Sequence, residues 1–115
     1  MHTTLAIKLL ASPTELTMAE RSKFMVGIDV ENRGASVVEP ELSRCQLLVN
    51  DKPSISWGLA IGNGTREPEW YKLPPGKHVT MSWPLGEALF EMPGDYHLVM
   101  QLGDQKSTAD VHVRP

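Results

Sequence analysis

The chain has 115 residues, with 11 Lys and Arg against 14 Asp and Glu, a formal net charge of −3 and a pI near 5.7. This length fits a single domain spanning residues 1–115. The slightly acidic charge, without a basic stripe, excludes nucleic acid as a partner, and no apolar stretch is long enough to span a bilayer, so we expect no membrane partner either.

Turn-forming residues are plentiful: Gly and Pro make up about 16% of the chain, against a usual share of about 12%. The prolines divide the chain into windows too short for a helical bundle but suited to strands. The first predicted strand covers residues 3–10. The following Ser12-Pro13-Thr14-Glu15 has two readings: a strand or extended turn, or the capped start of a short helix through Glu20.

Alternating apolar residues identify most of the later strands. In residues 24–31, Phe24, Val26, Ile28 and Val30 recur with a period of two, which predicts a strand with one apolar face. The other predicted strands are residues 42–49, 54–61, 65–73 (at a sheet edge because of Pro68), 78–83, 96–102 and 107–113. Residues 84–92 are expected to contain one helical turn.

Seven or eight short strands in a chain of this length predict an all-β fold, an immunoglobulin-like antiparallel β-sandwich. Tyr96 follows Pro93-Gly94-Asp95 and opens the second-to-last strand. This is the place of the tyrosine corner in such sandwiches, where the hydroxyl bonds a nearby backbone group.

Several segments carry a family resemblance. They are residues 30–34, 45–52 with Trp57, 73–77, 79–83 and 92–96. With them, the chain resembles the BsuPI-type intracellular proteinase inhibitor family and related bacterial immunoglobulin-like modules over roughly residues 24–102. The resemblance implies a β-sandwich and inhibition of a proteinase, but it assigns no inhibitory residue, because the segment after Trp57 departs from the family pattern.

Aromatic residues provide the main candidate for a binding surface. A hairpin turn at Asn63-Gly64 would place Trp57 opposite Trp70 at a sheet edge. The predicted partner-binding residues are Trp57, Asn63, Arg66, Glu67, Glu69, Trp70 and Tyr71. Flat amphipathic rings suit a protein or a carbohydrate partner, and we expect a protein. The alternative places Trp57 and Trp83 in the core, with Trp70 capping it. Self-association through an exposed edge strand is a further expectation.

Two histidines form the candidate metal site. If the last hairpin turns about Asp104-Gln105, His97 and His112 are direct cross-strand neighbours that could share a metal ion. A third ligand would come from Asp110 or from another chain. The alternative is that both histidines are solvated surface residues.

The sequence contains none of the enzyme motifs that we sought, so no catalytic residue and no cofactor are expected. Cys45 is the sole cysteine, which excludes an intrachain disulfide and predicts a small buried side chain or an idle thiol. The N-terminus shows no signal-peptide pattern. A cytoplasmic location is therefore expected, on the condition that Met1 is the native start.

Overall fold

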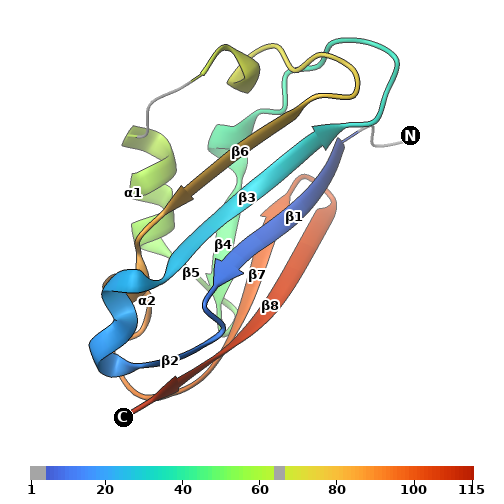
Figure 1. Cartoon of the computed structure of the whole chain (residues 1–115). Coiled ribbons are helices and arrows are strands. Elements are labelled where there is room, and N and C mark those ends of the chain that lie inside the picture. The colour runs from blue at the N-terminus through green and yellow to red at the C-terminus, as the bar shows by residue number, and fades with distance from the viewer. Residues whose placement is uncertain (1–4, 64–66) are drawn as a thin grey trace.

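The computed structural model describes residues 5–63 and 67–115 and shows two facing β-sheets (Figure 1). The three-stranded sheet has the order β1 (Leu5–Ser12), β3 (Met25–Asn32) and β6 (His78–Trp83), all antiparallel. The five-stranded sheet has the order β2 (Glu15–Thr17), β8 (Gln105–Arg114), β7 (Gly94–Leu102), β4 (Gln46–Val49) and β5 (Lys52–Pro53). Its pairs are antiparallel except for β2 with β8. The predicted all-β sandwich is confirmed.

The core lies between the two sheets. Val26, Ile28 and Val30 of β3 are fully buried, as their alternation predicts, and Leu98 and Met100 of β7 face them from the other sheet. The strands predicted for residues 24–31, 78–83, 96–102 and 107–113 therefore correspond closely to β3, β6, β7 and β8.

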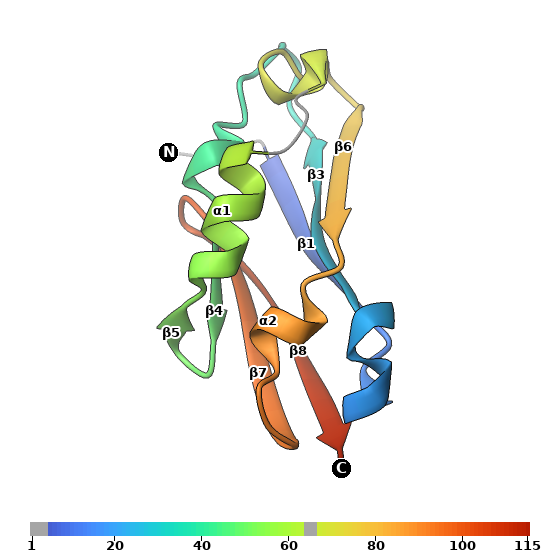
Figure 2. The ribbon, with the colours of Figure 1, turned by 90° about the vertical axis from the view of Figure 1, so that its left-hand side faces the viewer.

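Short helices close the open sides of the sandwich. They are η1 (Met18–Lys23), η2 (Leu42–Arg44), α1 (Ile55–Asn63), η3 (Pro68–Trp70) and α2 (Gly86–Leu89). Figure 2 shows α1 between the β4–β5 edge of one sheet and β6 of the other. The helix α2 confirms the helical turn predicted within residues 84–92.

The strand predicted for residues 54–61 is wrong, because this segment forms α1. The Ser54 hydroxyl accepts a hydrogen bond from the Trp57 amide at 3.1 Å, and the Ser54 carbonyl accepts one from the Gly58 amide at 3.3 Å. Trp57 and Ile61, one turn apart, then share the buried face of the helix. The capping serine and the apolar pair at helical spacing therefore favour a helix here, although the apolar residues of this segment also alternate as in a strand.

The edge strand predicted for residues 65–73 is also wrong in its described part. Pro68 starts the short helix η3, and Leu73 makes an isolated bridge to Val38. Arg66 and the predicted turn residues Gly64 and Thr65 lie outside the described residues.

The connection between β1 and η1 follows the extended reading rather than the helical one. A cis Ser12–Pro13 bond leads into the short strand β2. Capping occurs later, where a Glu20 carboxylate oxygen accepts hydrogen bonds from the Thr17 amide at 2.9 Å and the Thr17 hydroxyl at 3.1 Å. The capping interaction predicted between Ser12 and Glu15 is therefore found between Thr17 and Glu20 instead.

The predicted tyrosine corner is present. The Tyr96 hydroxyl donates to the Met92 carbonyl at 2.6 Å, and its ring lies 4.7 Å from that of Phe90. This bond fixes the entry of the chain into β7.

Candidate functional site

The two tryptophans of the predicted binding surface are buried. Trp57 on α1 is 1% exposed and Trp70 on η3 is 4% exposed. The Trp57 indole donates to the Cys45 carbonyl at 3.2 Å, and its ring meets that of Trp83 edge to face at 5.3 Å. The predicted pairing of Trp57 with Trp70 is therefore wrong, because neither residue lies on a strand. Trp57 is a core residue, as the alternative interpretation predicted.

The remaining predicted contact residues follow α1 along the chain. Asn63 ends the helix and donates to the Leu59 carbonyl at 2.9 Å. Glu67 is exposed, Glu69 is half-buried, and Tyr71 is 48% exposed. These side chains remain candidates for a contact surface.

The predicted pairing of His97 with His112 is wrong, because the hairpin turns one residue earlier than predicted. The hairpin turns at Gly103-Asp104, where Gly103 adopts a φ of 61°, so β7 and β8 pair His97 with Asp110 and Asp95 with His112. The histidines occupy diagonal positions rather than opposite ones.

Each of these histidines contacts a carboxylate instead. Nδ1 of His97 lies 2.7 Å from an oxygen of Asp110, and Nδ1 of His112 lies 2.5 Å from an oxygen of Asp95. All four side chains line one shallow hollow of about 450 Å³, together with Glu15. Among the described residues, no three His, Cys, Asp or Glu side chains are gathered as metal ligands.

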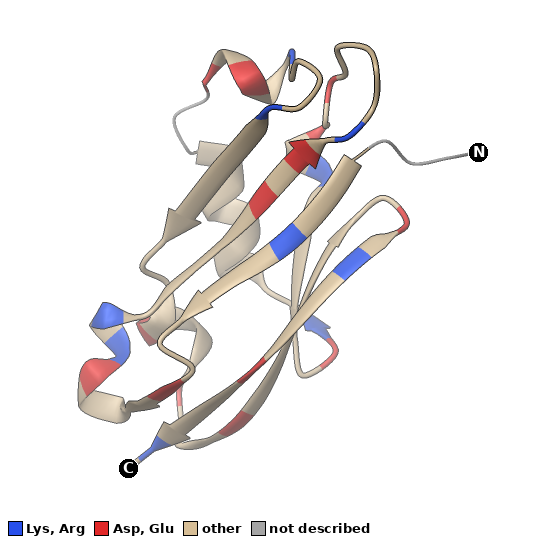
Figure 3. Cartoon of the chain, turned by 45° about the vertical axis from the view of Figure 1, so that its right-hand side comes forward, with Lys and Arg blue, Asp and Glu red and all other residues tan. Residues whose placement is uncertain are grey.

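The outer side of α1 carries a feature that the sequence reading missed. Ile55 is 80% exposed and Leu59 is 61% exposed, and Gly58 and Gly62 are exposed beside them. We call these four residues the α1 face. The chain has no charged residue between Lys52 and Arg66, and α1 is free of acidic and basic colour in Figure 3. Spacing of three and four residues within an uncharged segment is the signal that could have identified this face.

A hollow of about 250 Å³ lies beside the α1 face. It is lined by Ser43, Cys45, Gln46, Leu47, Pro53, Ser54, Trp57, Gly58, Ile61 and Gly62. A Cβ atom added at Gly58 or Gly62 would meet no atom within 4 Å, so the two glycines leave the helix side of this hollow open. The α1 face thus combines projecting apolar side chains with an adjoining recess.

Cys45 lies at the base of this region and is 3% exposed. Its thiol lies 3.2 Å from the Met100 sulfur, and burial raises the pKa of the thiol to about 12. The prediction of a small buried side chain is confirmed, and the high pKa makes the thiol a poor nucleophile at neutral pH.

A third histidine forms an ionic cluster on the outer face of the other sheet. Nδ1 of His78 lies 3.0 Å from Asp29, and its Nε2 lies 3.3 Å from Glu31. Thr80 donates to Asp29 at 2.6 Å. The hydrogen bond with Asp29, strengthened by the two negative charges, raises the pKa of His78 above its ordinary value of 6.5.

This cluster predicts a pH dependence of stability. A raised pKa means that the folded chain holds the His78 proton more tightly than the unfolded chain does. The stabilisation is therefore complete below pH 6.5 and is lost as the pH rises through the folded-state pKa. In urea unfolding, His78→Gln should destabilise the protein more at about pH 6 than at about pH 8.5. Lys77→Gln is the control, and equal losses for His78→Gln at both pH values would contradict the interpretation.

Comparisons with known proteins agree on the fold. The structure is similar to the CARDB domain of a Pyrococcus furiosus protein solved in complex with di-metal ions, with a TM-score of 0.58 and 15% identity over 99% of this chain and 98% of that one. It is also similar to part of a Listeria innocua β-glucosidase solved with glucose, with a TM-score of 0.54 and 12% identity. That match covers 96% of this chain and 16% of the glucosidase.

The chain has a CARDB-like, immunoglobulin-like fold. At these identities the similarity establishes the fold and nothing more. No protein-family model matches the sequence, and no curated protein matches it significantly. The resemblance to BsuPI-type inhibitors is thus supported as far as the immunoglobulin-like sandwich and no further.

Proposed function

We propose that this chain is a non-catalytic binding module that docks a protein through the α1 face. The observation that carries the proposal is the exposure of Ile55 and Leu59, at 80% and 61%, on a helix whose other side is already buried through Trp57 and Ile61. A helix that is apolar all round is normally enclosed by other protein. Complete burial of an Ile or Leu side chain contributes about 1.5–3 kcal/mol, so a partner that covers both gains substantial free energy.

The chemistry of this face favours protein over other partners. A nucleic acid requires Lys and Arg, which α1 lacks. A helix bound in a membrane interface carries a basic polar face opposite its apolar one, whereas the opposite face of α1 is core. None of the described helices is long and apolar enough to cross a bilayer.

The loop after α1 supplies a polar rim in this proposal. Asn63 ends the helix, and exposed Glu67 follows the segment outside the described residues. Interfaces commonly surround an apolar centre with polar groups of this kind. Glu69 and Tyr71 stay candidates for the same rim.

The test compares three variants of exposed residues in affinity capture from lysate of the source cell. Ile55→Gln/Leu59→Gln removes the apolar face, Glu67→Gln/Tyr71→Gln alters the loop, and Val37→Gln replaces an apolar residue that is 56% exposed elsewhere. We expect one specific protein to be captured by the unaltered chain, by the loop variant and by Val37→Gln. The α1 variant should not capture it. If the α1 variant retains it, or if the loop variant alone loses it, the α1 face is not the contact surface.

The class of partner that the sequence resemblance implies is a proteinase. The same α1 variant decides this case with purified enzymes. Inhibition by the unaltered chain that the α1 variant loses would identify the partner class, and an absence of inhibition across the proteinase classes would remove it.

Metal binding is a second candidate function, for which the two histidine–aspartate pairs provide the observation. Where an aspartate holds Nδ1 of a histidine, Nε2 is left to bind a metal, and metal-binding histidines are commonly held in this way. His97 and His112 line the same hollow, and the similar CARDB domain was solved with di-metal ions. Since no three ligands are gathered among the described residues, the two histidines with water would form a low-affinity site.

Zinc titration tests this second candidate. Addition of Zn²⁺ alone should shift the side-chain NMR signals of His97 and His112 and leave those of His78 unchanged. His97→Gln/His112→Gln should abolish the heat of Zn²⁺ binding in calorimetry, whereas His78→Gln should retain it. Unshifted histidine signals, or equal binding by the double variant, would eliminate the site.

A further inference from the structure

We infer that β6 binds an extended segment of another protein, which adds to the three-stranded sheet as a fourth strand. The segment is a single proline-free strand with apolar residues at alternate positions. This contact lies apart from the α1 face, so the inference goes beyond the proposed function. It starts from a row of backbone groups along β6, which pairs with β3 on one side only.

The direction of these backbone groups follows from the register of the sheet. The Leu9 amide of β1 points away from β3, because it donates to the Ser107 hydroxyl of β8 at 2.8 Å. Leu9 pairs with Ile28. The backbone groups of Ile28 therefore point to its other neighbour, Met81 of β6.

The N–H and C=O groups of His78, Thr80 and Ser82 consequently point away from β3, because successive residues of an antiparallel strand alternate in direction. All three residues are exposed. Within residues 5–63 and 67–115, no backbone hydrogen bond and no second strand reaches this side of β6. The edge thus presents a row of alternating donors and acceptors, which an extended backbone matches.

The other outer strands of the two sheets are protected in ways that β6 is not. The bond between Leu9 and Ser107 closes β1 against β8, β2 has three residues, and β5 has two, one of which is Pro53. Natural proteins blunt sheet edges with such coverings, short strands and prolines. In contrast, β6 has six residues in continuous register with β3 and contains neither proline nor lysine.

Helix α1 favours a lone strand over another sandwich as the occupant of this edge. Its Trp57 ring meets that of Trp83 on β6 at 5.3 Å, and Figure 2 shows α1 between β6 and the β4–β5 edge of the other sheet. The two sheets of a sandwich lie about 10 Å apart, so a second copy paired through β6 would bring its other sheet to the level of α1. A single strand needs only the space beside β6.

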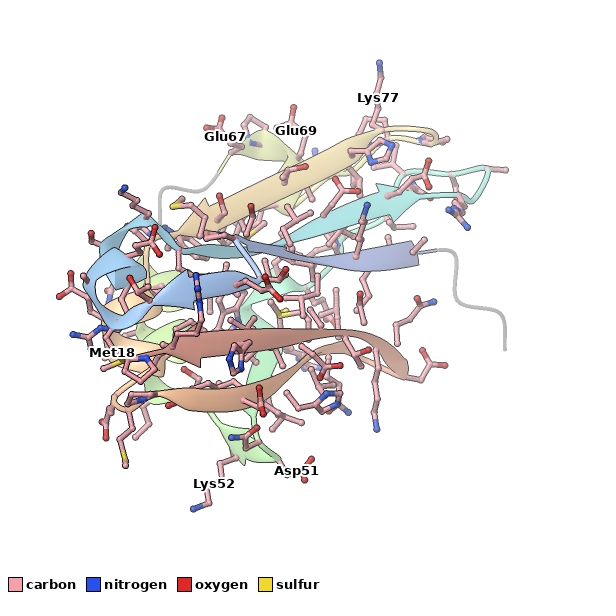
Figure 4. The ribbon with its side chains drawn as sticks, turned by 60° about the horizontal axis from the view of Figure 1, so that its bottom comes forward. Met18, Asp51, Lys52, Glu67, Glu69 and Lys77 are labelled. Carbon is pink, nitrogen blue, oxygen red and sulfur yellow. The ribbon has the colours of Figure 1, made fainter. Side chains whose placement is uncertain are left out.

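Backbone pairing, rather than charge, governs this contact. Figure 4 shows Glu67, Glu69 and Lys77 on the side of β6 that faces away from β3, so charges of both signs flank the edge. Inward residues of the added strand would lie beside Met81 and Trp83, which favours apolar side chains at alternate positions. A single short strand buries little area, which predicts weak binding that is lost when an affinity capture is washed.

NMR titration of the ¹⁵N-labelled chain with a synthetic peptide tests the inference. The probe is an acetylated and amidated peptide of alternating valine and threonine, with a lysine at each end. The amide signals of His78, Thr80 and Ser82 should shift and their hydrogen exchange should slow, because each N–H gains an acceptor. The same peptide with all of its amide nitrogens methylated should not bind.

Two substitutions of one residue separate the backbone from the side chain. Thr80→Pro removes an N–H that β3 does not use, so the sheet should stay intact and peptide binding should weaken by about tenfold. Thr80→Val keeps the N–H and loses only the hydroxyl that donates to Asp29, so it should bind as the unaltered chain does. Equal binding by the two variants, binding of the methylated peptide, or no shift in β6 at millimolar peptide would overturn the inference.

Further outcomes separate this contact from other occupants and from the proposed function. Ile55→Gln/Leu59→Gln should leave peptide binding unchanged, because both residues lie on α1. If the β6 signals shift with the concentration of the chain alone, the edge pairs with a second copy, and the inference is overturned. A peptide that shifts α1 signals and not those of β6 also overturns it, and leaves the α1 face in place.

Discussion

Trp57→Ala should destabilise the protein by about 3–5 kcal/mol, the usual cost of removing a large aromatic side chain from a core. Trp57 is 1% exposed, and its loss removes both the edge-to-face contact with Trp83 and the hydrogen bond to the Cys45 carbonyl. Because Trp57 is the main anchor of α1, the helix should also loosen. We expect a lower urea midpoint, together with faster amide exchange in residues 55–63.

The matched control is Leu59→Ala on the same helix. Leu59 is 61% exposed, so the free energy of unfolding of the dilute protein should change by no more than about 0.5 kcal/mol. Similar losses for the two variants would mean that the buried and outer sides of α1 have been assigned incorrectly.

Asn32→Asp should have an effect of comparable size, about 3–5 kcal/mol, since it places a carboxylate against backbone carbonyls in the interior. Asn32 is fully buried, and its amide nitrogen donates to the carbonyls of Ser36 and Leu73, both at 2.8 Å. Its side-chain oxygen accepts from the Gly34 amide at 2.8 Å. Aspartate keeps the acceptor but turns both donations into repulsion.

Asn63→Asp makes the same chemical change on the surface. Asn63 also donates to a carbonyl, that of Leu59, but solvent can replace the bond, so the urea midpoint should hardly move. An Asn32→Asp protein that unfolds at the midpoint of the unaltered chain would show that Asn32 does not hold the loop after β3 in place.

The sandwich was predictable because its strands bury one face each. Residues 24, 26, 28 and 30 are apolar at every second position, and the structure buries all four completely. Tyr96 was predictable for a different reason, since Pro93-Gly94 fixes the approach to β7 and leaves the hydroxyl within reach of the Met92 carbonyl.

Helix α1 was not predictable from alternation. Residues 55, 57, 59 and 61 are apolar and alternate with Ser, Gly and Ala, so a strand would place them on one face. The helix instead sends Trp57 and Ile61 inward and Ile55 and Leu59 outward. The four apolar residues thus lie on two opposite sides of a helix rather than on one face of a strand. The candidate binding surface is therefore the outer side of α1 and not the tryptophans, which are buried.

The histidine register depended on a single turn. A loop at Asp104-Gln105 pairs the two histidines, whereas the observed loop at Gly103-Asp104 pairs each histidine with an aspartate. Gly103 favours the observed loop because it takes a positive φ without steric cost. Local turn chemistry, rather than strand pattern, decided the composition of this site.

The most direct test of the α1 face as the contact surface is an NMR titration of the ¹⁵N-labelled chain with the purified protein that the unaltered chain captures. We expect shifts of amide signals in α1 and in residues 43–47 beside the hollow, with the signals of β6 and of the outer positions of β7 and β8 unchanged. Binding that shifts β6 or the β7–β8 face while the α1 signals stay in place would contradict the account.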